Sequence, residues 1–360
     1  MSLRRILPTR HAPALVLATG LLLAGGEARA ENVRESYPLL GALLEITVEG
    51  LNREGAHDRI QRAMEVARRL EAHFDLEDPG GAVARLNATA GRGRVRLPLD
   101  VYRLLALSQL MTRSTGGAFD VTVGPLVRRR QAAGADRAAR LGVGEALVLV
   151  GADKIVFHPP DAVELASVGM AIDFTAIAKG YTLERMASSL RAGGVVKALL
   201  RFDDTIALAV GPPADEAPFR VWVTYGKSTA GSVALRDRAF STTRAHRRGE
   251  ESAAAPIVDP RSGRLVEVDR QATVVARDAA LADAWSTALV VDPDGALGLL
   301  AEPRDVEALV FDEHGEHRSP RFEAFAGWKA GRRESGGEAP RDGTDRPDAS
   351  GSATAPPVRP

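Results

Sequence analysis

The chain has 360 residues, 47 basic and 47 acidic side chains, and no cysteine. The balanced charge argues against a general nucleic-acid binder, which carries a basic excess. The lack of cysteine excludes disulfides, thiolate metal sites, a cysteine nucleophile and the cysteine of a lipoprotein anchor. A hydrophobic fraction of 45% is that of a globular protein, and the length suits one large domain or two smaller ones.

The first 30 residues have the pattern of an export signal. Arg4 and Arg5 precede a short apolar run, and Ala28-Arg29-Ala30 places small residues at the two positions that a signal peptidase reads. A membrane-spanning helix needs about 20 apolar residues, so a retained anchor is the weaker alternative. We therefore predict a signal peptide at 1–30 and a mature periplasmic protein that is not a lipoprotein.

Strand-like and helix-like patterns alternate after this segment. Residues 43–48 read as a strand, and apolar side chains recur at helical spacing from Asp58 to Phe74. Asp100 is the expected N-cap of a second helix, and a third helix is expected from Thr175 to Leu190. The other expected elements are strands at 147–150, 154–157, 195–200, 206–210, 219–225, 271–276 and 307–311 and a helix at 281–291. This mixture predicts an α+β fold with strands in the central layer.

The last residues have a different composition. From Lys329 to Pro360 the chain is rich in Gly, Ser, Pro, Asp and Arg and has almost no large apolar side chain. Such a segment cannot offset the entropy lost on ordering. We predict one domain over 31–328 and a disordered tail over 329–360.

Common nucleotide-binding and hydrolase motifs are missing from the sequence. There is no GxGxxG, P-loop, HExxH or GxSxG, which weakens the Rossmann dehydrogenase, NTPase, zinc protease and α/β-hydrolase interpretations. Four other segments could carry chemistry.

The first two segments combine glycines with charged residues. Gly116-Gly117-Ala118-Phe119-Asp120 could bring a backbone close to a ligand, although a plain glycine turn is the commoner reason for such a pair. In the second segment, Ile172–Tyr181, Asp173 could cap a helix or accept hydrogen bonds from a ligand. Lys179 could be solvated or could face a phosphate as a point charge.

The other two segments are a turn and a helical motif. Pro256–Gly263 by itself reads as a turn with Pro and Gly. On a helix, Asp283, Ser286 and Thr287 would share one face. They present only hard oxygen atoms, which suit Mg²⁺ better than Zn²⁺ or copper. An Asp near a helix N-terminus is the plainer alternative for Asp283.

Together and in this order, the four segments resemble the ApbE family, the FAD:protein FMN transferases, over residues 38–312. The resemblance implies a single α+β, T-fold-related domain with mixed strands and helices around a flavin cleft. It also implies a Mg²⁺-dependent reaction. FAD is cleaved at its pyrophosphate, AMP leaves, and FMN is joined by a phosphoester to a Thr or Ser hydroxyl of a partner flavoprotein.

The resemblance further implies site residues and partners. The positions that match FAD contacts are Ala118, Phe119, Asp120, Asp173, Lys179 and Val258. The positions that match metal ligands are Ala176 through its carbonyl, Asp283, Thr287, and Ser286 where some members supply a further oxygen. The implied partners are FAD, Mg²⁺ and an acceptor flavoprotein of a membrane redox complex or a periplasmic reductase, with no nucleic acid. No residue identifies itself as the general base.

Several positions depart from the family pattern. Leu40-Gly41-Ala42 stands for Met-Gly-Thr, Asp203-Asp204 for a Gly-Gly turn, and Thr242-Thr243-Arg244 for Thr-Ser-Gly. Gly81 stands for a Ser and Pro256 for a His. Two carboxylates in the turn would crowd a ligand and repel phosphate. Two alternatives to flavin transfer therefore stay open: a non-catalytic flavin-binding protein, and a Mg²⁺-dependent FAD pyrophosphatase in which water replaces the acceptor hydroxyl.

Overall fold

The computed structural model describes residues 31–133, 142–247, 257–301 and 305–331. The predicted signal peptide lies outside the described residues, as does the predicted tail from residue 332 onward. The first residues assigned to that tail are structured, because Lys329–Ala330 form strand β14. Their pairing with Ser232 and Gly231 supplies the backbone hydrogen bonds that composition alone does not predict. The prediction of disorder from residue 329 is therefore wrong at its start.

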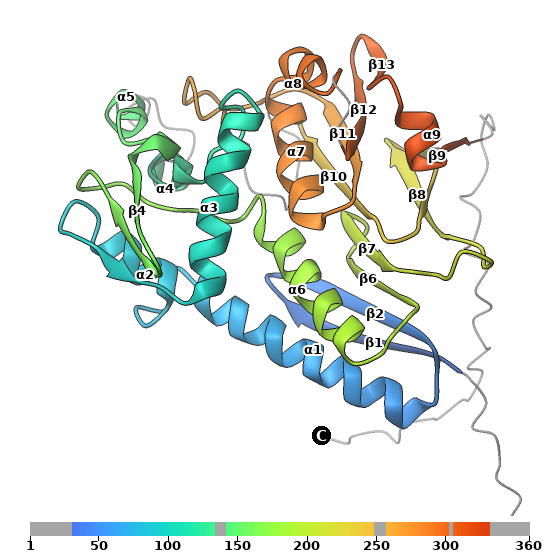
Figure 1. The fold of residues 1–360 in the computed structure, drawn as a ribbon. Helices are drawn as coiled ribbons and strands as arrows, with labels where there is room; N and C mark the ends of the chain where they lie inside the picture. Colours follow the sequence, from blue (N-terminus) through green and yellow to red (C-terminus); the bar gives the residue numbers. More distant parts are fainter. Residues whose placement is uncertain (1–30, 134–141, 248–256, 302–304, 332–360) are drawn as a thin grey trace, which may run out of the picture.

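A fully antiparallel eight-stranded sheet forms the centre of the domain (Figure 1). Its strands, in spatial order, are β1 (Glu31–Leu39), β2 (Ala42–Leu51), β6 (Ala198–Phe202), β7 (Ile206–Val210), β10 (Ala239–Ala245), β11 (Arg270–Ala276), β12 (Val306–Asp312) and β13 (Gly315–Arg318). In β2, buried and more exposed residues alternate, as expected where one face is covered. In β7, β11 and β12 almost every residue is buried, so this part of the sheet is covered on both faces.

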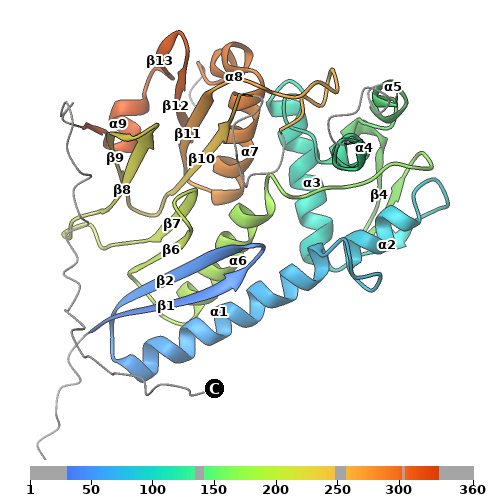
Figure 2. The same ribbon diagram turned by 180° about the vertical axis from the view of Figure 1, so that it is seen from behind.

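Three helices cover one face of the sheet (Figures 1 and 2): α1 (Arg53–Phe74), α6 (Ala178–Ala192) and α7 (Ala279–Val291). The side chain of Asn52 caps α1 by accepting a hydrogen bond from Gly55 N. In the same way, Asp278 caps α7 through Leu281 N. The buried side chains of α1 recur every three or four residues, so one stripe of the helix faces the core.

The opposite face of the sheet is covered by a second, smaller layer. This layer consists of β8 (Phe219–Tyr225), β9 (Ser228–Leu235), β14 and α9 (Phe322–Ala326). Its apolar core joins Val223 and Val233 of this layer to Phe240 and Val275 of the main sheet. The β7–β12 half of the sheet is therefore the middle of three layers.

Most of the remaining elements lie on the side of α7 away from β8 and β9, and α8 follows directly on the end of α7 (Figures 1 and 2). They are a small sheet of β3 (Val95–Arg96), β5 (Ala162–Leu165) and β4 (Ile155–His158), and the helices α2 (Ala82–Ala88), α3 (Leu99–Ser114), α4 (Gly124–Ala133), α5 (Val143–Leu147) and α8 (Pro293–Leu299). Their apolar residues join the main core. In the described part of the chain, no helix has the length and apolar character needed to cross a bilayer.

The predicted α+β fold is confirmed, with local corrections. Helix α3 begins at Leu99, so Asp100 lies in its first turn and is not its N-cap. Helix α6 begins at Ala178, not Thr175, because Asp173 closes a turn on Thr175 N before the helix starts. Residues 147–150 are the end of α5 and a turn, not a strand.

Candidate functional site

The first two motif segments lie against each other. Asp173 N donates to the carbonyl of Val121 at 2.8 Å. A Cβ on Gly124 would lie 2.7 Å from the carbonyl oxygen of Ala171, so only glycine permits this contact. Asn87 of α2, which the sequence did not single out, fixes the second segment through both backbone groups of Ile172 at 2.7 and 3.0 Å.

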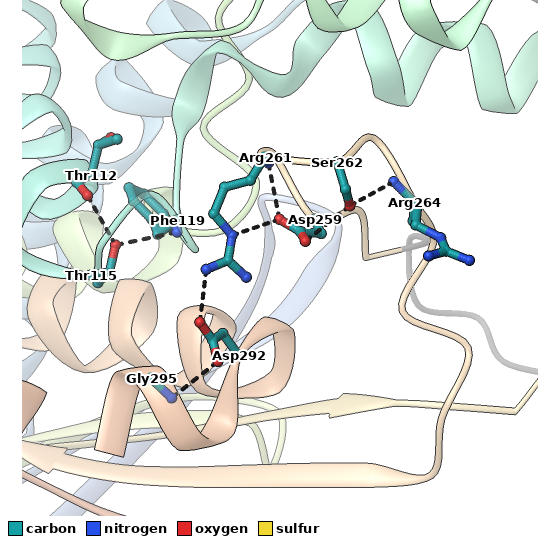
Figure 3. A network of polar contacts seen from close by, with 9 residues as sticks. All are labelled: Thr112, Thr115, Phe119, Asp259, Arg261, Ser262, Arg264, Asp292 and Gly295. Carbon is teal, nitrogen blue, oxygen red and sulfur yellow. Dashed lines mark hydrogen bonds and ion pairs between the residues drawn. The ribbon is translucent and has the colours of Figure 1, made fainter. Parts of the chain in front are cut away.

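The turn after α3 is shaped by glycines and by internal hydrogen bonds. Gly116 and Gly117 both have positive φ, and Thr115 Oγ1 accepts a hydrogen bond from Phe119 N at 3.2 Å (Figure 3). Ala118 and Phe119 are buried. The side chains predicted to contact FAD are therefore part of the protein core, and the glycine turn exposes backbone instead.

Asp120 is buried, and its carboxylate already has three partners. It accepts from Thr122 N at 2.8 Å, Thr122 Oγ1 at 2.6 Å and Ala152 N at 3.0 Å. Burial raises its pKa, and these hydrogen bonds oppose the rise. Asp120 thus ties the glycine turn to the chain at Ala152. It also lines a cavity of about 360 Å³ with residues of α3 and of the loop before β4.

The second and fourth segments meet where helices α6 and α7 cross. A Cβ on Gly180 would lie 2.2 Å from the carbonyl oxygen of Ala279, so the close approach of the two helices requires glycine here. Gly180 N donates to Asp283 Oδ2 at 3.0 Å. Because α6 begins at Ala178, this N–H belongs to the first turn, whose donors have no partner within the helix, and Asp283 satisfies it. Ala176 lies two residues before the start of the same helix.

Asp283 is the carboxylate at the centre of this crossing. Burial raises its pKa to about 6, and Gly180 N, Lys179 and Ser241 oppose the rise. Its helix also carries Thr287, whose hydroxyl lies 3.4 Å from the Asp283 carbonyl oxygen and whose side chain is partly exposed. Carbonyl, carboxylate and hydroxyl oxygens are a donor set that fits Mg²⁺.

No cluster of three or more His, Cys, Asp or Glu side chains that could hold a metal occurs in the described residues. A cation at the crossing would therefore be held by one carboxylate and by neutral oxygens. Ala176, Asp283 and Thr287 supply these atom types, so the residues present fit the predicted metal.

Ser286, predicted as a further metal ligand, is fully buried between α7 and β10. Its hydroxyl lies 2.9 Å from the Asp283 carbonyl oxygen, 3.1 Å from Ser241 Oγ and 2.7 Å from Thr243 Oγ1. A hydroxyl donates one hydrogen bond and accepts two, so these three oxygens use its full capacity. Ser286 is placed to hold α7 against β10.

Lys179 lies between this crossing and the β6–β7 turn. Its Nζ is 6.0 Å from the ring centre of Phe202, the last residue of β6. The adjacent residue, Asp203, has a φ of 44° and accepts a hydrogen bond from Leu43 N at 3.2 Å. Asp204 has a side chain that is 97% exposed. Asp203 and Asp204 are the two carboxylates expected to repel a phosphate. The Asp203 carboxylate therefore lies against β2, and the Asp204 carboxylate lies in solvent.

Arg244, another departure from the family pattern, points away from α7. Ser241 and Thr243 face the helix, and alternate residues of a strand face opposite sides. Arg244 pairs with Asp269 at 3.0 Å and lies 5.7 Å from the ring centre of Tyr225, on the side of the smaller layer. It does not occupy the face that carries Asp283.

The third segment folds back next to the first one. Val258 is buried, pairs with Leu265 and packs against Leu126 and Ala146 in a small separate core. Pro256 lies outside the described residues. In the same loop, Asp259 accepts hydrogen bonds from Arg261 and Ser262 (Figure 3). Burial opposes ionisation of Asp259, but these hydrogen bonds and the charge of Arg261 lower its pKa.

The fold and the site thus define an α+β domain in which two crossing helices bring one carboxylate, neutral oxygens and a lysine together. The ApbE family model matches residues 40–310, and the chain belongs to this family. Both the predicted family and the predicted fold class are confirmed.

Curated relatives of this chain carry the name of one enzyme. The FAD:protein FMN transferase of Treponema pallidum (strain Nichols) is 27% identical over 317 residues, which cover 81% of this chain and 87% of that protein. The FAD:protein FMN transferase of Rhodobacter capsulatus is 27% identical over 292 residues, which cover 77% of this chain and 55% of that protein. The chain is therefore a member of a family of transferase enzymes.

Solved structures show the same fold. The ApbE protein of Thermotoga maritima superimposes with a TM-score of 0.72 at 23% identity and covers 82% of this chain and 99% of its own. The flavinyl transferase ApbE of Pseudomonas stutzeri, in its apo form, gives a TM-score of 0.69 at 23% identity, with coverage of 82% and 97%. At this identity the likeness concerns the arrangement of the elements.

Proposed function

We propose that this chain is a Mg²⁺-dependent FAD:protein FMN transferase that acts in the periplasm on an exported flavoprotein. The observation that supports it most is the hydrogen bond from Gly180 N to Asp283, which joins the start of α6, just after Ala176, to the predicted metal-binding carboxylate in a chain of the ApbE family. The names of the curated relatives support the reaction, and the sequence pattern of residues 1–30 supports export.

The residues at the α6–α7 crossing would have separate roles in binding Mg²⁺ and the pyrophosphate of FAD. Ala176 through its carbonyl, Asp283 and Thr287 would hold Mg²⁺, which when bound neutralises charge on the pyrophosphate oxygens. Lys179, the residue before Gly180 on α6, would add a positive charge that faces a phosphate oxygen. Because Gly116 and Gly117 have no side chains, a ligand could come close to the backbone of the glycine turn. Ser286 keeps α7, and with it Asp283, in place.

The transfer itself needs an acceptor hydroxyl. An oxygen of a Thr or Ser on the partner flavoprotein forms a bond to the FMN phosphorus, the pyrophosphate bond breaks, and AMP leaves with the bridging oxygen. The hydroxyl proton passes to a base that the site residues do not identify. Because the attacking and leaving oxygens must lie in line, positioning supplies much of the rate.

A flavin-transfer assay tests the proposal. The chain without its predicted signal peptide is incubated with FAD, Mg²⁺ and an acceptor domain that a characterised relative modifies, and intact mass is measured. We expect the acceptor to gain the mass of FMN, with AMP released in equal amount. Asp283→Asn should abolish transfer, whereas Asp294→Asn, an exposed carboxylate of α8, should not. An unmodified acceptor, in a reaction where the relative succeeds, would refute the proposal.

The same assay separates the two alternatives that the departures from the family pattern leave open. A FAD pyrophosphatase releases FMN and AMP when no acceptor is present. A non-catalytic flavin-binding protein retains FAD and releases no AMP under either condition. The Asp203 carboxylate accepts from Leu43 N, the Asp204 side chain lies in solvent, and Arg244 pairs with Asp269 on the other face of the sheet, which favours transfer over both alternatives.

A further inference from the structure

Arg261 joins three segments that are far apart in the sequence (Figure 3). Its Nε donates to Asp259 Oδ1 at 3.1 Å within its own loop, and its Nη1 donates to Asp292 Oδ2 at 2.7 Å, where α7 ends and α8 begins. Its aliphatic stem lies on the glycine turn, since a Cβ on Gly117 would be 3.4 Å from Arg261 Cγ. One side chain thus contacts the turn before Ala118, the loop after Val258 and the end of the metal-site helix.

The guanidinium is well suited to this position. Its planar fork can hold two carboxylates in fixed directions, which a lysine cannot do. Hydrogen bonds to Asp292 and Asp259 raise the pKa of Arg261, and hydrogen bonds from Arg261 and Ser262 lower the pKa of Asp259 despite its burial. Asp292 also caps α8 through Gly295 N at 3.0 Å, so it is itself held in place.

The exposure of Arg261 indicates that it orders its loop but contributes little to the stability of the whole domain. The side chain is 40% exposed, and exposed ion pairs contribute little to the free energy of unfolding. Gly263 packs closely against Val143 and Leu126 on the far side of the loop, and Ser262 bonds to Asp259 and Arg264 N of the same loop. Arg261 is the residue that ties the tip of the loop to the α7–α8 junction. Loss of Arg261 should therefore loosen the loop without unfolding the domain.

We propose that Arg261 is a positioning residue that clamps the glycine turn and the Asp259–Gly263 loop to the α7–α8 junction before any ligand binds. The part of this proposal that concerns FAD rests on the proposed function, because the two clamped segments adjoin Ala118 and Val258, which match flavin contacts. A preformed wall lowers the entropy that binding must overcome, so the clamp should act on FAD affinity more than on the chemical step.

The test compares Arg261→Gln with Arg264→Gln in the full mature chain. Both variants lose one positive charge from the same loop, but the side chain of Arg264 makes no ion pair with any described residue. In the ligand-free protein, Arg261→Gln should raise early deuterium uptake at residues 116–120 and 259–263 by about twofold, and Arg264→Gln should not. Arg261→Lys should restore only part of the protection.

The second measurement uses FAD. Arg261→Gln should raise the dissociation constant and the KM for FAD by about tenfold while kcat at saturating FAD stays within about twofold, and Arg264→Gln should change neither. Unchanged deuterium uptake in Arg261→Gln overturns the clamp, whether or not the wild type binds FAD. Equal loss of affinity in both variants also overturns it, because charge alone then explains the effect. A wild type that binds no FAD refutes the proposed function, and the exchange measurement then decides the clamp by itself.

Discussion

The α6–α7 crossing and the Arg261 loop are both held to the same helix, but by different forces. At the crossing, Gly180 lets two backbones touch, and the hydroxyls of Ser286, Ser241 and Thr243 join α7 to the sheet. At the tip of the loop, partly exposed charges join Arg261 to Asp259 and Asp292. The difference indicates that the geometry of the proposed metal site depends on packing and fails only with the fold, whereas the tip of the Arg261 loop can loosen on its own.

Gly180→Ala should have the largest effect, because the new Cβ would lie 2.2 Å from the carbonyl oxygen of Ala279 and backbone cannot yield cheaply. We expect the free energy of unfolding to fall by about 3 kcal/mol, measured by urea denaturation. Gly298→Ala in α8 is the matched control, since nothing lies within 4 Å of its added Cβ. That variant should be neutral or slightly stabilising. A similar small change in both would mean that the helices can separate without cost.

Glu184 of α6 gives the crossing a pH dependence. Burial, with a contribution from Asp278, raises its pKa to about 7, although Ala279 N donates to it at 2.7 Å. The folded state therefore binds this proton more tightly than the unfolded state. The resulting stability is present below pH 4.5, the ordinary pKa, and is lost as pH rises through about 7.

Between pH 5 and pH 8 the free energy of unfolding should decrease, by about 2 kcal/mol at most from this group. Glu184→Gln keeps an acceptor for Ala279 N and should flatten that slope, whereas Glu267→Gln, an exposed residue, should not. Denaturation curves at several pH values measure this. If the slope persists in Glu184→Gln, another group is responsible.

Ser286 and Thr287 are neighbours on α7, but substitution of Ser286 should affect stability and substitution of Thr287 should affect Mg²⁺ binding. Ser286→Ala leaves the buried hydroxyl of Ser241 and the partly buried hydroxyl of Thr243 with one partner fewer and should lower the free energy of unfolding by about 1 kcal/mol. Thr287→Val, at a partly exposed position, should leave stability within about 0.5 kcal/mol but weaken Mg²⁺ binding, measured by calorimetry. Weaker Mg²⁺ binding in Ser286→Ala at unchanged stability would instead support the prediction that Ser286 is a metal ligand.

The sequence singled out residues that the structure places at the α6–α7 crossing, but it could not predict their geometry. The motifs and the family resemblance led to Asp283, Lys179 and the glycine turn. They could not show why Gly180 is glycine, because the reason is the backbone of Ala279, 99 residues later. Nor could they show that Arg244 points away from α7. The strand that carries it, β10, contains small and hydroxyl side chains and lacks the alternation that reveals a strand.

The β6–β7 turn should show the smallest change in stability. Asp203 has a φ of 44°, where glycine is less strained, but it also accepts a hydrogen bond from Leu43 N. Replacing Asp203 and Asp204 by Gly relieves the backbone strain but loses the hydrogen bond from Leu43 N. The free energy of unfolding should therefore change by less than about 0.5 kcal/mol.

If the two carboxylates hinder flavin binding despite their placement, the Gly-Gly variant will bind FAD several-fold more tightly and more so at low salt, because screening weakens exposed charges. Our expectation is the opposite: FAD affinity, measured by fluorescence quenching at low and high salt, should change by less than about twofold. Asp203 lies against β2 and Asp204 in solvent. We therefore expect this turn to resemble the crossing, and not the Arg261 loop, because its geometry is set by the backbone around it. A large gain in FAD affinity would instead mean that the charges of Asp203 and Asp204 weaken FAD binding in this chain.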